Sequence, residues 1–238
     1  TNDSVIVWLP QHKICLTGNL FGCTFGHFPN LVTIRGDRYR DALTVAAAVQ
    51  VVLDLGADTI LYGHHAPVVG TELIATELSV LRDAILYVHD ATVKGMNAGV
   101  DLPTLMATIQ LPAELEVGQG YGKVSWSVRA IWENYAGWFK HESTTELYAQ
   151  PRSAIHQDLI ELAGGPEAII KRAQGKLAEK KYVEALHLLD IVLPQQGYVP
   201  GVVTAALAAH EALLQDSANF WLSSWLKNQI KLLQNRRA

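Results

Sequence analysis

Short runs of β-branched and other apolar residues, broken by turn residues, characterise the first 70 positions and predict β-strands. Three such runs are rich in Val, Ile, Leu and Thr: VIVWL, KICLT and TILYG. The first two lie close together and predict a hairpin within residues 5–19. RYRDALTVAAAVQVVLDLG follows a long Gly- and Phe-rich loop, and its apolar spacing and terminal Gly56 predict a helix. The predicted order is strand, strand, long loop, helix, strand and loop.

From residue 71 onward, apolar residues recur every three or four positions, the period of a helix that buries one face. TELIATELSVLRDAILYVHDATVKGMNAG predicts one long helix with Thr71 as its N-cap and Ala-Gly at its end. DLPTLMATIQ predicts a short helix capped by its Asp, and SWSVRAIWENYAGWF predicts an aromatic helix. Further helices are predicted at 153–162, 166–179, 181–193, 200–215 and 217–234. This change of pattern predicts a domain boundary near residues 70–76.

One helical segment, KLAEKKYVEALHLLDIVL, resembles a tetratricopeptide hairpin, with an aromatic near a tight turn and an Ala-Leu stripe. A repeat array needs about three such units, and one is evident. The last part of the chain is therefore predicted to consist of stacked helical hairpins, each burying its apolar stripe on a neighbour.

Composition is that of a folded, water-soluble protein. The chain has 238 residues, 49% hydrophobic and 18% charged, with a formal net charge of −4. The charges are scattered, so no basic surface for nucleic acid is predicted. No apolar run reaches the roughly 20 residues of a membrane span, and no targeting signal is recognised. Cys15 and Cys23 are predicted to be free thiols.

Two adjacent histidines, His64 and His65, follow the third predicted strand in the loop GHHAPVVG. A loop at the end of a strand is held by a rigid element, and imidazole is a common zinc ligand. Histidines in a Gly/Pro turn can equally bond to backbone groups. Both interpretations remain open on spacing alone.

The run PNLVTIRG brings Asn30 and Arg35 to the two ends of a short extended segment. The planar guanidinium fork binds sulfate, phosphate or carboxylate, and an Asn amide can donate alongside it. The alternative is that Arg35 forms a surface ion pair and Asn30 a turn. Together with the histidine loop, the pair favours oxyanion chemistry near a metal.

Four segments in the same order carry a family resemblance: PNLVTIRGDRYRDA, YGHHAPVVG, RDAILYVHDATVKGMNAG and GYGKVSWSVRAIWENYAGWF. They resemble the alkyl sulfatase branch of the metallo-β-lactamase superfamily. The resemblance implies an α+β protein, with residues 1–72 forming the C-terminal portion of a metallo-β-lactamase αββα sandwich. It implies that residues 73–238 form a helical dimerisation domain, including tetratricopeptide-like hairpins.

The resemblance also implies a zinc hydrolase in which two metal ions activate water and an Asn and an Arg hold the sulfate group. His64 matches the last metal-binding histidine of the superfamily, with His65 as a weaker candidate. Asn30 and Arg35 match the sulfate-binding pair. Tyr121, in the Gly-rich turn before the aromatic helix, matches a tyrosine that would bond the sulfate or the leaving oxygen.

Two departures from the family pattern affect the metal site. The HxHxDH motif, which supplies most metal ligands and belongs N-terminal to VIVWLP, is absent from this sequence. Asn19 stands where the family has an acidic residue that bridges the metals, and a neutral amide is a poor bridge. His27 is the local replacement to consider, although it can also be a packing residue. His89 is interpreted as a satisfied buried histidine.

The leading hypothesis is a part of a metal-dependent sulfuric ester hydrolase that cleaves sulfate monoesters of apolar alcohols, with zinc as cofactor. The chain would then be a fragment, or one chain of a split or processed enzyme. The alternative is a catalytically incomplete helical module for dimerisation with a vestigial hydrolase half. Both hypotheses predict a homodimer, because the aromatic helix and the long helix carry much apolar surface.

Overall fold

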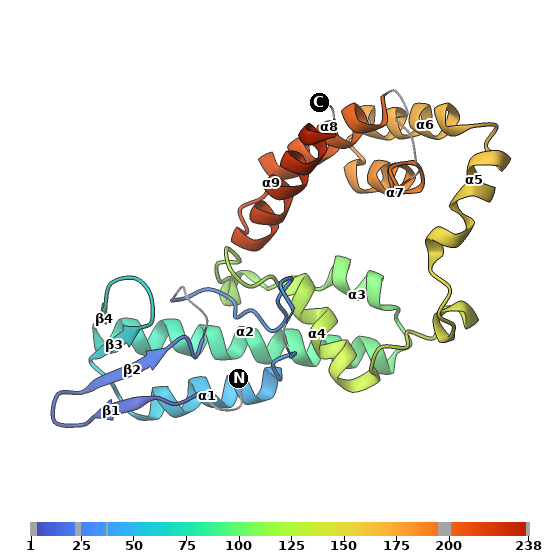
Figure 1. Ribbon diagram of the computed structural model, residues 1–238. Coiled ribbons are helices and arrows are strands. Elements are labelled where there is room, and N and C mark those ends of the chain that lie inside the picture. Colours follow the sequence, from blue (N-terminus) through green and yellow to red (C-terminus); the bar gives the residue numbers. More distant parts are fainter. Residues whose placement is uncertain (1–3, 22–24, 37, 195–200, 237–238) are drawn as a thin grey trace. The chain divides into compact units, whose positions relative to one another are not determined.

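The computed structural model describes residues 4–21, 25–36, 38–194 and 201–236. The described residues are mostly helical with one small sheet, which confirms the α+β class (Figure 1). They fall into two compact units with the bounds Thr1–Glu142 and Ser143–Ala238. None of the described helices combines the length and apolarity needed to cross a membrane.

Four strands of the first unit form one sheet in the order β1-β2-β3-β4: Val7–Leu9, Ile14–Gly18, Thr59–Tyr62 and Val68–Val69. β1 and β2 form the expected antiparallel hairpin, and β3 pairs parallel to β2, with Cys15 opposite Ile60. β4 pairs antiparallel to β3. The sequence predicted a loop at β4, because a two-residue strand leaves no periodic signal.

Helix α1 (Ala42–Asp54) makes the crossover between the parallel strands β2 and β3. The Asp41 side chain caps it by accepting a hydrogen bond from the Thr44 N–H at 2.7 Å. Gly56, which has a φ of 59°, lies just beyond its end, as predicted.

Helix α2 (Thr71–Asn97) is the predicted long helix, and Gly99, with a φ of 73°, follows its end. The predicted Thr71 N-cap is wrong. Gly70 occupies the cap position and has no side chain with which to cap the helix, whereas the Thr71 hydroxyl donates to the Asp58 carboxylate.

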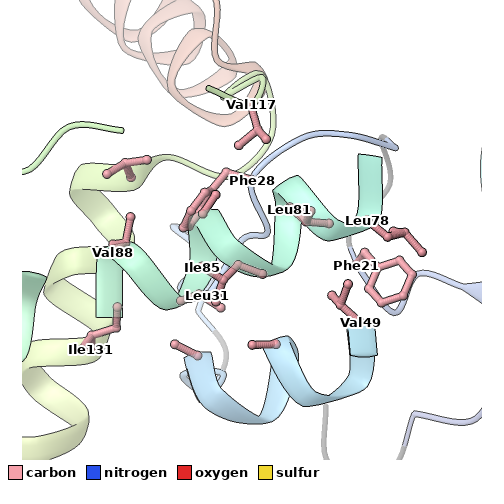
Figure 2. Packing of buried hydrophobic residues seen from close by; sticks show 14 of the residues in the cluster. Phe21, Phe28, Leu31, Val49, Leu78, Leu81, Ile85, Val88, Val117 and Ile131 are labelled. Atoms are coloured by element: carbon pink, nitrogen blue, oxygen red, sulfur yellow. The ribbon is translucent and has the colours of Figure 1, made fainter. Parts of the chain in front are cut away.

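The core of the first unit lies along the buried face of α2. Leu78, Leu81, Ile85 and Val88 recur at three- and four-residue spacing and are fully buried. Figure 2 shows them among other apolar residues of the same cluster, including Val49 of α1 and Ile131.

Helices α3 (Leu102–Thr108) and α4 (Val124–Ala136) complete this unit, with the short helix η1 (Ala113–Leu115) between them. The Asp101 carboxylate caps α3 by accepting from the Thr104 N–H at 2.9 Å, and this bond lowers the pKa of Asp101. The predicted aromatic helix is part core and part surface, because Trp132 of α4 is buried whereas Tyr135 is exposed.

The second unit has its own hydrophobic core, which includes Ile170, Leu189 and Ala206. Its helices lie close to the predicted positions, except that the segment predicted as one helix at 153–162 is divided into η3 and α5. The elements are η2 (Thr144–Leu147), η3 (Arg152–Ile155), α5 (His156–Leu162), α6 (Pro166–Ala178), α7 (Tyr182–Val192), α8 (Val202–Gln215) and α9 (Phe220–Asn235).

The change from strand to helix falls where the sequence pattern changes, between Val69 of β4 and Thr71 of α2. The division into compact units falls later, after Glu142. It does so because α2, α3 and α4 share one hydrophobic core with the sheet and α1.

Candidate functional site

A pocket of about 260 Å³ in the first unit collects most of the predicted site residues. It lies at the end of β2 and is also lined by the loop that precedes α1 and by the turn that precedes α4. Four of the predicted residues border it: Asn19, Asn30, Arg35 and Tyr121. Its apolar lining includes Leu20, Phe21 and Val45.

Arg40 is a lining residue that the sequence reasoning missed, although it stands in the quoted segment RYRD. The Nη1 atom of its guanidinium donates to the backbone carbonyl of Asn30 at 2.8 Å, and its backbone N–H donates to the carbonyl of Leu31 at 2.9 Å. These bonds close the loop that carries Asn30 and Arg35. Asn30 is held in a buried position, whereas Arg35 is exposed.

The described lining residues carry two guanidinium groups, those of Arg35 and Arg40, and no carboxylate. The lining therefore carries positive charge, and each of its polar side chains can donate a hydrogen bond. Such a lining suits an oxyanion.

Tyr121 reaches the pocket because its Gly-rich turn is fastened to the segment His27–Pro29. The Phe28 N–H donates to the Gly118 carbonyl at 2.8 Å, and the Gly120 N–H donates to Nδ1 of His27 at 3.3 Å. A Cβ on Gly122 would lie 2.3 Å from the backbone oxygens of Phe28 and Pro29. Only glycine allows an approach this close.

His27 thus binds the turn through Nδ1, and its ring lies against Gly118. It is not among the residues that border the pocket. This placement favours the packing interpretation, and a metal-binding role for His27 stays a prediction.

The histidine loop touches the pocket at Asn19. The Asn19 amide nitrogen lies 3.2 Å from Nε2 of His64, and because an amide NH2 can only donate, Nε2 accepts this bond. Gly63 permits the contact, since a Cβ there would lie 2.2 Å from Oδ1 of Asn19. His64 and His65 border a second, mainly apolar pocket of about 220 Å³ with Phe25 and Tyr62.

The described residues do not fit a complete zinc site. In residues 4–21, 25–36, 38–194 and 201–236, no three His, Cys, Asp or Glu side chains gather closely enough to hold a metal ion. His64 adjoins the neutral Asn19 rather than a carboxylate. A zinc ion needs three or four protein ligands, and at most the two adjacent histidines are offered here.

His89 is a satisfied buried histidine, as the sequence predicted. Its Nδ1 lies 2.8 Å from Oδ1 of Asp90, and its Nε2 lies 2.8 Å from the hydroxyl of Tyr135.

Cys15 is a buried free thiol whose pKa is raised by burial. Cys23 lies outside the described residues.

The comparisons with known proteins concern the family and the fold. Residues 102–220 match the family described as alkyl sulfatase dimerisation. A linear primary-alkylsulfatase of a Pseudomonas species is 32% identical over 177 residues, which is 72% of this chain and 33% of that protein. The yeast alkyl/aryl-sulfatase BDS1 of Saccharomyces cerevisiae is 24% identical over 240 residues, covering 98% of this chain and 36% of that protein.

A solved structure shares the fold. The stereoselective inverting sec-alkylsulfatase Pisa1 from a Pseudomonas species superposes with a TM-score of 0.87 at 24% identity, covering 96% of this chain and 37% of that one. The chain spans about a third of the length of these relatives, 33% of the first.

Proposed function

Because the chain belongs to the alkyl sulfatase dimerisation family, we propose that it is part of a sulfuric ester hydrolase and that its pocket binds the sulfate group of alkyl sulfates. The observation that carries the proposal is the pocket lining: two guanidinium groups, two Asn, a Tyr and no carboxylate among the described residues. The alkylsulfatases among its relatives support the choice of a sulfate ester.

The chemistry of a sulfate monoester matches this lining. The ester carries one negative charge spread over oxygens that can only accept hydrogen bonds. Arg35 and the Asn30 amide would hold these oxygens, and the Tyr121 hydroxyl would donate to a sulfate oxygen or to the leaving oxygen. The apolar residues Leu20, Phe21 and Val45 would take the alkyl chain.

Zinc remains part of the proposal for the whole enzyme, in which a metal would supply an activated water and His64 one ligand. For this chain the proposal is confined to binding the sulfate group, since its described residues do not form a metal site.

Membership of a sulfuric ester hydrolase also implies a fold for the whole enzyme, which we include in the proposal. The sheet with α1 would belong to a metallo-β-lactamase αββα sandwich, and α6 with α7 would form a tetratricopeptide-like hairpin.

Replacing Arg35 by methionine tests the proposal. A hydrogen bond to a charged group contributes about 1.5–3 kcal/mol, so the affinity for hexyl sulfate should fall roughly 10- to 150-fold. Isothermal titration calorimetry of the chain with hexyl sulfate measures this change.

Arg38→Met is the matched control, because Arg38 is in the same loop and is not among the lining residues. It should bind hexyl sulfate like the unchanged chain. The proposal is wrong if the unchanged chain shows no binding, or if Arg35→Met binds as tightly as Arg38→Met.

A second candidate function is that of a dimerisation module without hydrolysis. The absence of a metal-binding group of three side chains among the described residues favours it. We propose that a second copy of this chain covers the aromatic surface at the end of α4, where Tyr135 is 58% and Trp138 68% exposed. Both residues lie within the segment that matches the dimerisation family.

Light scattering coupled to size exclusion should give twice the mass of one chain, and Trp138→Glu should shift the protein toward the monomer by placing a charge in the interface. Val51→Glu is the control, because Val51 is 53% exposed on α1 and lies outside residues 102–220. A monomer at every concentration, or equal effects of the two variants, would contradict this interface. A dimer that does not bind hexyl sulfate would favour the second candidate function.

A further inference from the structure

Two threonines of the pocket have hydroxyl groups without a hydrogen-bond partner. Thr17 is 2% and Thr33 is 8% exposed, and both border the pocket. Within the described part of the chain, the Oγ1 atoms of both residues are shielded from solvent and make no hydrogen bond. A buried hydroxyl left unpaired destabilises a protein, so each such group calls for an explanation, and a bound ligand is one.

Their positions follow from two separate segments. Thr17 lies two residues after the fully buried Cys15 on β2, so strand alternation directs both toward the interior. Thr33 lies in the loop between Asn30 and Arg35, which the bonds of Arg40 hold closed. Both residues thus border the pocket that Arg35 and Arg40 also border.

We propose that Thr17 and Thr33 are specificity-determining residues whose hydroxyls donate hydrogen bonds to the oxygens of a bound tetrahedral oxyanion. This inference rests on the proposed function. For this role each Oγ1 must turn toward the pocket by rotation about the Cα–Cβ bond when the oxyanion binds. In the structure both hydroxyls are shielded from solvent, so the bound sulfate group would supply the acceptor that they lack.

Each hydroxyl has opposite effects in the two states. Unpaired, it destabilises the unliganded chain, whereas in the complex its hydrogen bond stabilises the bound oxyanion. Replacing either Thr by the similarly shaped Val removes an unpaired polar group from the empty chain. It also removes a donor from the liganded chain. Stability without ligand and affinity for ligand should therefore change in opposite directions.

The test compares Thr17→Val, Thr33→Val and the double variant with the unchanged chain. Each single Val variant should bind hexyl sulfate about tenfold more weakly, as expected for loss of a bond to a charged group. Its midpoint of thermal unfolding without ligand should equal or exceed that of the unchanged chain. Thr17→Ser and Thr33→Ser, which keep the hydroxyl, should retain affinity within about twofold.

Ser127→Ala is the matched control. Ser127 of α4 is 1% exposed, its Oγ is also buried without a partner, and it does not border the pocket. Its replacement should leave the affinity unchanged. Inorganic sulfate serves as a second probe, and the Val variants should lose the same factor toward it, because the hydroxyls act on the oxyanion rather than on the alkyl chain.

The outcomes separate this inference from the proposed function. If the unchanged chain binds hexyl sulfate and Arg35→Met does not, while both Val variants bind normally, the threonine inference is wrong and the proposed function stands. Val variants that unfold at lower temperature with unchanged affinity would show a structural role and overturn the inference. A loss toward hexyl sulfate alone would likewise overturn the assignment to the oxyanion. Failure of the unchanged chain to bind either probe would reject the proposed function itself.

Discussion

Replacing Leu81 by alanine is expected to lower the free energy of unfolding of the first unit by about 3–5 kcal/mol. Leu81 is fully buried at the middle of α2, in the core cluster that also includes Phe28, Leu31 and Val49 (Figure 2). Truncation removes buried apolar surface and leaves a cavity that close-packed neighbours fill only in part. Urea unfolding followed by circular dichroism measures the loss.

Leu73→Ala isolates the contribution of burial. Leu73 is on the same helix and is 50% exposed, so the same chemical change should cost well under 1 kcal/mol there, about the range of surface substitutions. Equal losses for the two variants would mean that α2 does not bury the face described here.

Gly122→Ala is expected to destabilise the first unit by about 3 kcal/mol, at the upper end of typical overpacking costs. The added Cβ would lie 2.3 Å from two backbone oxygens, and backbone atoms cannot move aside as the end of a side chain can. The turn that carries Tyr121 must then separate from Phe28 and Pro29. The midpoint of thermal unfolding should fall by roughly 6–12 °C, and binding of hexyl sulfate should weaken.

Gly175→Ala is the control for this substitution. Gly175 is in α6, where an added Cβ meets nothing within 4 Å, and alanine favours a helix by about 0.5–1 kcal/mol over glycine. This variant should be as stable as the unchanged chain or more stable. A Gly122→Ala chain that unfolds at the original temperature would contradict the close approach of the two segments.

Local patterns in the sequence were sufficient to predict most of the elements. The buried positions of α2 recur at helical spacing, and Asp101 caps α3 through a local bond. The errors arose where a distant group competed with a local one. The Thr71 hydroxyl bonds to Asp58 rather than to its own helix, and β4 exists only because β3 lies beside it.

Four of the residues that border the pocket were named from the sequence, but their gathering in one pocket could not be read from spacing. Asn30 and Arg35 are close in sequence, whereas Tyr121 joins them through the contact of Gly118 and Gly122 with the segment 27–30. No periodicity reports such a contact. The closely spaced glycines of VGQGYGK are the sequence feature that accompanies this contact. The two pocket threonines were missed because an unpaired hydroxyl becomes visible only when the surrounding structure is known.

The fastening of the Tyr121 turn to His27 also has a consequence for the order of folding. The hydrogen bond from Gly120 to His27 joins positions 93 residues apart. Closing so long a loop costs chain entropy before the contact returns any stabilisation, unless the intervening segments have already compacted. The contact is therefore expected to form after α1 and α2 have docked, which makes the pocket that Tyr121 borders one of the last features to arise on the folding pathway.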